Sequence, residues 1–311
     1  MERVCGLDAP MPDARGCVAV LGFFDGMHLG HRALMAAARA EADRLSLPLH
    51  VFTFADGTGI KADQPRLSSE EDRCAALLGA GASLVVEGDF RAMAPLSAVA
   101  FVDDILIGRM GARAAFCGFN FRFGRDAAGD APLLRRLMEE RGREAYIVPA
   151  VFAAGEQVSS GAIRAALAAG EPERAAALLG RPYTLTGMIE HGRALGRTIG
   201  CPTVNLHLPV GLALPRFGVY AGFCRIGARV FRAVTNLGVR PTVSQSGRVS
   251  LESHLLDCDE NLYGQRATVA FLRYLREERR FDDLAALEAQ IARDTEAARS
   301  VALPEGNEEE R

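Results

Sequence analysis

Residues 22–31, GFFDGMHLGH, lie between a short apolar run and an alanine-rich stretch with the pattern of a helix. The apolar run predicts a buried strand, so we expect the turn at a strand-to-helix junction. Glycines let the backbone approach a ligand closely, and the start of a helix offers free N–H groups and a partial positive charge. His28 and His31 can donate hydrogen bonds to phosphate oxygens and stabilise the charge that grows there during transfer.

The turn therefore predicts a phosphate site, with His28 and His31 as its catalytic candidates. The alternative interpretation is an ordinary glycine-rich turn with solvated histidines. The other candidates for phosphate binding in this turn are Gly22, Phe24, Asp25, Gly26 and Gly30.

The composition is that of a folded globular protein without an excess of positive charge. Hydrophobic residues make up 49% and charged residues 24% of the 311 residues, both near globular averages. The 36 basic and 39 acidic residues give a formal net charge of −3, which argues against nucleic acid as a partner. The length is sufficient for two domains, each with its own core.

The seven cysteines are scattered and contain no CxxC pair, which argues against a disulfide framework and a cysteine zinc site. The first sixteen residues lack the apolar core of a signal peptide, and no segment approaches the eighteen apolar residues of a membrane span. We therefore expect a cytoplasmic protein without a membrane partner. The sequence carries no signal about oligomeric state.

Residues 17 to about 180 alternate between strand-like and helix-like patterns. Such alternation predicts an α/β fold, a Rossmann-like parallel sheet covered by helices. Ligands of these sheets bind beyond the carboxyl ends of the strands, at the point where the strand order reverses. The predicted strands are 17–23, 48–54, 83–87, 113–117 and 144–149, and the predicted helices are 31–45, 69–79, 97–110, 131–141, 160–169 and 172–179.

After residue 180 the pattern changes to short runs rich in Val, Thr, Tyr and Phe that are separated by glycines. This pattern predicts an antiparallel barrel or sandwich followed by a terminal helix over 282–299. We therefore expect one domain over 1–180 and another over 181–311. The predicted strands of the second are 183–190, 218–226, 229–236, 249–257 and 266–274.

Two further loops of the first domain have anion-binding character. Residues 118–130, GFNFRFGRDAAGD, offer Asn120 and Arg122, although their phenylalanines could equally be core residues under a long loop. Ser159, Ser160 and Arg164 lie at the start of a predicted helix, where capping alone would also explain the serines. Together with the first turn, these loops favour nucleotide transfer.

The order of motifs resembles that of the prokaryotic bifunctional riboflavin kinase/FAD synthetases. Residues 22–31 resemble the family's GxFDGxHxGH signature, and 118–130 resemble its second adenylyl-transfer motif. Residues 196–205, GRTIGCPTVN, look like the flavokinase GRTxGxPTxN stretch, and 251–257, LESHLLD, follow in the family's order. The resemblance extends from about residue 17 to residue 299.

This resemblance implies an FMN adenylyltransferase over 1–180 and a riboflavin kinase with a flavokinase-like barrel over 181–311. The kinase moves the γ-phosphoryl group of ATP to riboflavin, and the adenylyltransferase joins FMN to the α-phosphate of a second ATP. Thr203 and Asn205 are implied ligands of Mg²⁺-ATP, and Glu252 is the implied base for the ribityl hydroxyl. Without the family, Glu252 would be interpreted as a solvent-facing strand carboxylate. The implied ATP-binding residues of this half are Gly196, Arg197 and Thr198.

Three departures from the family pattern lie in the adenylyltransferase half. Residues 55–60 replace a PHP-type turn, Gly161 replaces a threonine, and Gln157 stands where a basic residue is common. Losing one charge-assisted contact to a transition state costs on the order of 1.5–4 kcal/mol. We therefore predict a competent riboflavin kinase joined to a slower or altered adenylyltransferase.

Other interpretations stay open. One is a kinase alone, whose degenerate nucleotidyltransferase domain serves as a nucleotide- or flavin-binding or regulatory module. Another is an unrelated HxGH nucleotidylyltransferase with a regulatory second domain. A third is a flavin-binding protein without catalytic activity.

Overall fold

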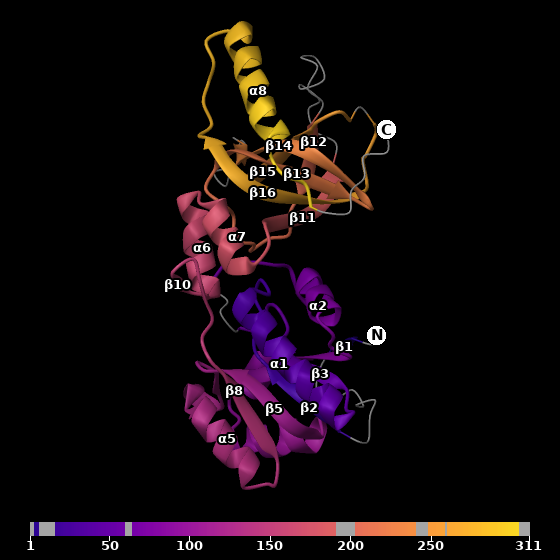
Figure 1. The fold of residues 1–311 in the computed structure, drawn as a ribbon, viewed down its shortest axis with the longest axis vertical. Coiled ribbons are helices and arrows are strands. Elements are labelled where there is room, and N and C mark those ends of the chain that lie inside the picture. The colour runs from indigo at the N-terminus through magenta and orange to yellow at the C-terminus, as the bar shows by residue number, and fades with distance from the viewer. Residues whose placement is uncertain are drawn as a thin grey trace. The chain divides into compact units, whose positions relative to one another are not determined.

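The computed structural model describes residues 3–5, 16–59, 64–190, 203–240, 248–258 and 260–304. The chain divides into two compact units, residues 1–160 and 161–311. The first unit contains a sheet flanked by helices, and the second contains a barrel (Figure 1).

Within the described residues, the sheet of the first unit has six strands, all parallel, in the order β1-β4-β3-β2-β5-β8. The chain adds β3 and β4 on one side of β2, and then returns to add β5 and β8 on the other side. The strand order therefore reverses between β2 and β5, where such sheets form a ligand crevice. The strands are β1 (Arg3–Cys5), β2 (Cys17–Leu21), β3 (Leu49–Phe54), β4 (Leu84–Gly88), β5 (Ala112–Gly118) and β8 (Glu144–Val148).

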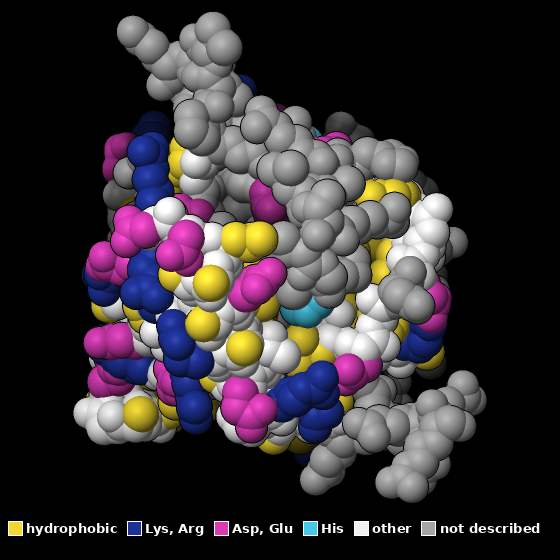
Figure 2. Space-filling view, turned by 90° about the horizontal axis from the view of Figure 1, so that it is seen from above, with side chains coloured by type: hydrophobic (Ala, Val, Ile, Leu, Met, Phe, Trp, Pro, Cys, Tyr) yellow, Lys and Arg dark blue, Asp and Glu magenta, His cyan; other side chains and the backbone are white. Residues whose placement is uncertain are grey.

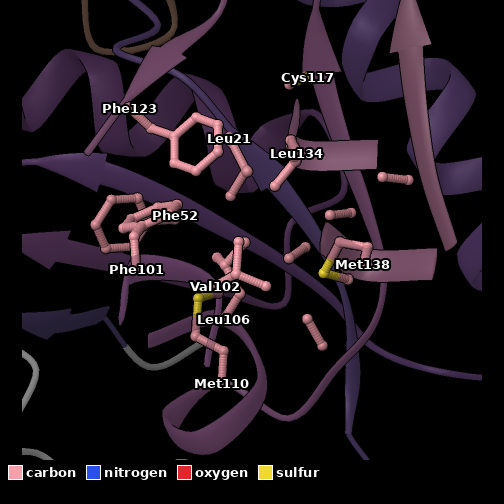
Figure 3. Packing of buried hydrophobic residues seen from close by; sticks show 14 of the residues in the cluster. Leu21, Phe52, Phe101, Val102, Leu106, Met110, Cys117, Phe123, Leu134 and Met138 are labelled. Carbon is pink, nitrogen blue, oxygen red and sulfur yellow. The ribbon is translucent and has the colours of Figure 1, made fainter. Parts of the chain in front are cut away.

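Both faces of this sheet are covered, as the alternation of side chains along β2 shows. Val18 and Val20 pack with Leu34 and Met35 of the helix that follows β2. Cys17, Ala19 and Leu21 point to the opposite face, where a cluster includes Phe101, Leu106 and Leu134 (Figure 3). The main helices of this unit are α1 (Leu29–Leu45), α2 (Glu70–Gly79), α3 (Phe90–Met93), α4 (Ala98–Ala100) and α5 (Ala131–Glu139).

The helix predicted over 97–110 is not a regular α-helix. It starts as α4, with the Ser97 hydroxyl accepting the Ala100 N–H, and then widens into the π-helix η1 (Phe101–Arg109). Phe101, Val102 and Leu106 of this segment are buried. Hydrophobic spacing predicts that a helix exists here but not how wide its turns are.

Several short elements of the first unit were not predicted, because two or three residues carry no periodicity. They are the hairpin β6 (Arg122–Phe123) with β7 (Gly129–Asp130), the 3₁₀ turn η2 (Arg125–Ala127), and the hairpin β9 (Phe152–Ala153) with β10 (Glu156–Gln157). Strand β1, which pairs with β4, was also missed.

The described strands of the second unit form a closed antiparallel barrel in the order β11-β12-β15-β14-β13-β16. This confirms the barrel and excludes the sandwich. Strand β12 is absent from the predicted strands. The barrel strands are β11 (Tyr183–Glu190), β12 (Thr203–His207), β13 (Gly218–Ile226), β14 (Arg229–Arg240), β15 (Arg248–Leu255) and β16 (Arg266–Arg276).

Three helices accompany the barrel: α6 (Ser160–Ala169), α7 (Pro172–Leu179) and α8 (Leu284–Arg299). Leu284 begins the terminal helix that the sequence predicts over 282–299, but its side chain is 56% exposed. The buried positions are instead Gln290, Asp294 and Ala298. The carboxylate of Asp294 accepts a hydrogen bond of 2.8 Å from Arg276 of β16, which satisfies the buried charge.

The surface of the second unit carries both signs of charge. Positive and negative side chains lie intermixed on the face that Figure 2 shows. The second unit has exposed ion pairs such as Arg229–Glu260 and Arg299–Asp257.

Candidate functional site

The two histidines of the GFFDGMHLGH turn lie together at the N-terminus of α1. His28 is the N-cap, and its Nδ1 accepts a 3.3 Å hydrogen bond from the backbone N–H of His31. The two imidazole rings stack, with 3.7 Å between centroids. A Cβ at Gly30 would lie 3.2 Å from the His28 ring, so glycine leaves the room that this ring needs.

The rest of the turn has a strained backbone held by buried side chains. Phe24 and Met27 have φ values of 57° and 45°, which are unusual for residues with side chains. Phe24 is fully buried, and its ring packs 5.2 Å from that of His31. The carboxylate of Asp25 accepts the N–H of Leu67 at 2.7 Å. The side chains of Phe24 and Asp25 thus fix the conformation of the turn.

The serine motif reaches this turn from 135 residues further along the chain. The Ser160 hydroxyl donates a 3.0 Å hydrogen bond to the backbone carbonyl of Asp25. Ser159 lies beside it and is half-buried. The structure therefore brings two of the predicted anion-binding segments together. Arg164 lies one turn further into α6, within residues 161–311.

The third predicted loop begins where β5 ends. Leu21 and Cys117 pair in register on β2 and β5, so the loops after these strands start at neighbouring strand ends. Asn120 and Arg122 are exposed there. Phe123 is buried in the core, so the interpretation of its ring as a core side chain is correct, whereas Phe119 is 44% exposed.

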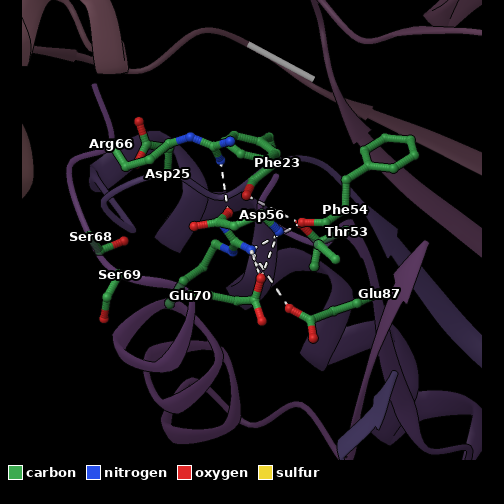
Figure 4. A network of polar contacts seen from close by, with 12 residues as sticks. Phe23, Asp25, Thr53, Phe54, Asp56, Arg66, Ser68, Ser69, Glu70 and Glu87 are labelled. Carbon is green, nitrogen blue, oxygen red and sulfur yellow. Dashed lines mark hydrogen bonds and ion pairs between the residues drawn. The ribbon is translucent and has the colours of Figure 1, made fainter. Parts of the chain in front are cut away.

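A buried network at the end of β3 was missed by the sequence analysis (Figure 4). Arg73 of α2 is fully buried and donates to the Asp56 carboxylate at 2.8 Å and to the Phe54 carbonyl at 3.0 Å. Its guanidinium also lies 3.6 Å from the carboxylate of Glu87, which is 1% exposed. Arg66 donates to the same Asp56 oxygen at 2.9 Å. Arg73 lies one helical turn before the buried Leu77, and this spacing was the available sign that its side chain faces the core.

This network connects the unusual turn at 55–59 to the histidine turn. The guanidinium of Arg66 lies 4.4 Å, and that of Arg73 5.0 Å, from the centroid of the Phe23 ring. The Thr53 hydroxyl donates to the Phe23 carbonyl at 3.2 Å. Residues around the segment that lacks the PHP-type turn therefore hold the first half of the GFFDGMHLGH turn.

In the second unit, strand register brings three predicted residues together. Thr203 pairs with His254, and Asn205 pairs with Glu252, across β12 and β15. Their inward neighbours Leu206 and Ser253 are buried, so these side chains share the outer face of the barrel. The Ser250 hydroxyl donates to the Glu252 carboxylate at 2.9 Å.

A small pocket opens beside Thr203. It is lined by Ile189, Thr203, Val204, Leu255, Cys258, Glu260, Leu262 and Tyr263. The predicted ATP-binding residues Gly196, Arg197 and Thr198 lie outside the described residues.

The donor set at β12 suits a magnesium ion held mainly by phosphate. The described part of the chain contains no group of three or more His, Cys, Asp or Glu that could hold a metal by itself. Mg²⁺ keeps water and substrate phosphates as ligands and needs few protein oxygens. The hydroxyl of Thr203 and the amide oxygen of Asn205 fit that requirement.

Comparison with known proteins matches each half of the chain to a family. A model of the FAD synthetase family matches residues 11–162, and a model of the riboflavin kinase family matches residues 179–302. A Pseudomonas fluorescens protein, the bifunctional riboflavin kinase/FMN adenylyltransferase, is 38% identical over 98% of this chain and 99% of its own length. The chain belongs to this bifunctional family.

Relatives in other bacteria support the same assignment. The bifunctional riboflavin kinase/FMN adenylyltransferase of Escherichia coli K12 is 37% identical over 91% of this chain and 92% of its own length. The protein of the same name from Bacillus subtilis is 30% identical over 90% and 91%.

A solved structure shares the architecture of this family member. It is described as a macrolide-efflux protein from Streptococcus pneumoniae, and it matches with a TM-score of 0.87 and 30% identity over 96% of this chain and 99% of its own. The parallel sheet and the barrel predicted from sequence are thereby confirmed. Across the described residues, no helix has the length and apolar character needed to cross a bilayer.

Two buried thiols, one in each unit, are poor nucleophiles. Burial raises the pKa of the Cys117 thiol, at the end of β5, to about 12, and that of the Cys224 thiol, on β13, to about 12. Since the thiolate is the reactive form, neither cysteine suits covalent catalysis at neutral pH. Both sites are suited instead to positioning and charge stabilisation.

Proposed function

We propose that this chain phosphorylates riboflavin with ATP to give FMN, and adenylylates FMN with a second ATP to give FAD. The observation that carries the proposal is the presence of two separate constellations in one chain. His28 and His31 lie at a helix start beside the switch point of a parallel sheet, and Thr203, Asn205 and Glu252 lie in register on a barrel.

The adenylyl transfer is assigned to residues 1–180. The phosphate of FMN, already anionic at neutral pH, attacks the α-phosphorus of ATP, and pyrophosphate leaves. No side-chain nucleophile is needed, so the turn acts by positioning and by stabilising negative charge. His28, His31 and the positive end of α1 stabilise this charge. The residues proposed to bind ATP in this reaction are Gly22, Gly26, Gly30, Asn120, Arg122, Ser159, Ser160 and Arg164.

The kinase reaction is assigned to residues 181–311. Glu252 accepts the proton of the ribityl hydroxyl as that oxygen attacks the γ-phosphorus, and ADP leaves. Thr203 and Asn205 hold Mg²⁺, which when bound neutralises charge on the ATP phosphates. The register supports this assignment, because it sets the carboxylate of Glu252 directly beside Asn205.

The protein is proposed to act in the cytoplasm on small molecules alone. Within the described residues, Cys17, Cys74, Cys117, Cys224 and Cys258 are free thiols, as expected in a reducing compartment.

A paired assay tests the function. The protein is incubated with ATP and Mg²⁺, and with either riboflavin or FMN, and the flavins are separated. We expect FMN and FAD from riboflavin, and FAD from FMN. FMN without FAD in both assays would favour the kinase-only interpretation, and no flavin product would contradict the proposal.

Glu252→Gln tests the division of labour between the sites. The variant keeps the size of the side chain but cannot accept the proton, so FMN formation should be lost. FAD formation from supplied FMN should stay at the wild-type rate, because Glu252 has no part in that reaction. Equal loss of both reactions would contradict the assignment of separate sites.

A further inference from the structure

Glu278 reaches β14 from the segment that follows β16. Its carboxylate accepts a 2.7 Å hydrogen bond from the side-chain Nδ2 of Asn236. Gly238, two residues further along β14, leaves the space that this carboxylate occupies, because a Cβ at Gly238 would overlap its oxygens. Gly238 of β14 and Glu278 after β16 thus together hold the amide side chain of Asn236.

The contact with Glu278 fixes which way the amide of Asn236 faces. A carboxylate can only accept hydrogen bonds, so the NH₂ group must face Glu278 and the Oδ1 must face away from it. Within the described part of the chain, this Oδ1 is buried and has no hydrogen-bond partner. A buried acceptor without a donor is rare in folded proteins and calls for an explanation.

The position of Asn236 supplies the explanation. Asn236 pairs with Glu252 across β14 and β15, and Glu252 pairs with Asn205 on its other side. Side chains paired in this way lie on one face, with roughly 5 Å between their Cβ atoms. The side chain of Glu252 acts as an acceptor in its bond from Ser250. The missing donor is therefore expected from a ligand that binds over this row.

We propose that Oδ1 of Asn236 accepts a hydrogen bond from a ribityl hydroxyl of the flavin substrate, and that Glu278 is the positioning residue that orients the amide. This inference rests on the proposed kinase function. If Glu252 accepts the proton of the attacking hydroxyl, a second hydroxyl of the same polyol chain falls beside Asn236. Such a contact would align the chain for attack and select substrates that carry the hydroxyl.

Asn236→Ala combined with substrate analogues tests the contact. Steady-state kcat and KM of FMN formation are measured with riboflavin and with its 2′-, 3′- and 4′-deoxy analogues. We expect Asn236→Ala to lower kcat/KM for riboflavin roughly tenfold or more, the usual effect of losing a buried hydrogen bond. With the wild-type protein, one deoxy analogue should have a kcat/KM lower than that of riboflavin by the same factor. With Asn236→Ala, that analogue and riboflavin should have equal kcat/KM values.

Two results would overturn the contact. One is an equal additional loss with every deoxy analogue, which would mean that Asn236 acts independently of the ribityl hydroxyls. The other is non-additivity with N3-methylriboflavin alone, which would assign the donor to the flavin ring.

Variants of Glu278 test the positioning role without disturbing the barrel, because this side chain is exposed. Glu278→Ala should reproduce the analogue-specific defect. Glu278→Gln should keep the wild-type kcat/KM, since the amide oxygen of glutamine can still accept the hydrogen bond from Nδ2 of Asn236. The matched control is Glu277→Ala, which removes a neighbouring exposed carboxylate paired with Arg216 and should leave kcat/KM unchanged. Equal activity of the Ala and Gln variants at 278 would contradict the proposal.

The adenylyltransferase serves as an internal control in each variant. FAD formation from supplied FMN should stay at the wild-type rate. A wild-type protein that makes no FMN would remove the proposed kinase function itself. A wild-type protein that makes FMN, with Asn236→Ala unaffected, would remove only this inference.

Discussion

The imidazole rings of His28 and His31 stack 3.7 Å apart, with 16° between their planes, at the first turn of α1. Because Nδ1 of His28 accepts the His31 backbone N–H, the proton of a neutral His28 lies on Nε2. His28 therefore caps the helix with Nδ1 and, when neutral, has its proton on Nε2. Capping and phosphate binding are thus compatible in one side chain.

Replacing His28 by Asn or by Ala should separate these two roles. Asparagine is a good N-cap, so His28→Asn should keep its stability, whereas His28→Ala should lose about 1 kcal/mol. Both variants lack the imidazole donor, so FAD formation from FMN should fall roughly 10²- to 10³-fold in each. Flavin separation measures the rate, and urea unfolding followed by circular dichroism measures the stability. An unchanged rate in His28→Asn would contradict a catalytic role.

Arg73→Met should be among the most destabilising single changes in the first unit. It leaves Glu87 buried without its cation and removes the donor to Asp56, so we expect a loss of about 3–5 kcal/mol. Arg73→Met with Glu87→Gln should lose less than the sum of the single changes. The control is Arg136→Met, whose exposed pairing with Glu140 should contribute no more than about 0.5 kcal/mol. Additive losses would argue against coupling between Arg73 and Glu87.

The parts of the fold that repeat along the chain were predictable, and the isolated parts were not. The alternation of strands and helices up to Leu179 gives the parallel sheet, because each element is long enough to show its period. Strand β12 (Thr203–His207) alternates polar and apolar residues, but it is only five residues long and was interpreted as part of a phosphate-binding motif rather than as a strand. The burial of Asp294 on α8 could not be explained from the spacing of the helix alone, because its partner Arg276 lies eighteen residues earlier.

The candidate sites show the same division. The histidine turn could be recognised locally, since a strand, glycines and a helix start lie within one stretch. The barrel site could not, because Asn205 and Glu252 meet only through strand pairing across a long sequence separation. The hydrogen bond between Asn236 and Glu278 was not predicted, since a contact between a strand and a later loop leaves no pattern in either segment.

Gly108→Ala should destabilise the protein, although alanine normally stabilises a helix relative to glycine. A Cβ at Gly108 would lie 2.9 Å from the Asp103 carbonyl oxygen, because the π-helical turn brings these residues together. We expect a loss of about 1–3 kcal/mol. The control is Gly79→Ala at the end of α2, where a Cβ meets nothing within 4 Å and a gain of about 0.5–1 kcal/mol is expected. Stabilisation by both alanines would show that the π-helix relaxes to an α-helix without cost.

The stability of the chain should fall above pH 9, in part through Cys117. Burial raises the pKa of this thiol from 9.0 to about 12. The thiol ionises near pH 9 in the unfolded chain, whereas it keeps its proton up to about pH 12 in the folded protein. Between these two pH values, unfolding therefore releases a proton. The stabilisation is complete below pH 9 and falls by about 1.4 kcal/mol per pH unit until the folded thiol ionises.

Urea unfolding of wild type and Cys117→Ala at several values between pH 8 and pH 11 measures this contribution. Cys224 also has a raised pKa, and the hydrogen bond to Glu144 raises the pKa of Tyr146 to about 12. The stabilisation from these two groups also falls as the pH rises, and it does so equally in both proteins. Only the wild type has the Cys117 thiol. Its free energy of unfolding should therefore fall more steeply with pH, by the slope that corresponds to about one proton released on unfolding. Cys117→Ala should start lower at pH 8, because it loses packing in the core, and the two curves should converge as the pH rises. Parallel curves would mean that the thiol ionises in the folded protein near its ordinary pKa.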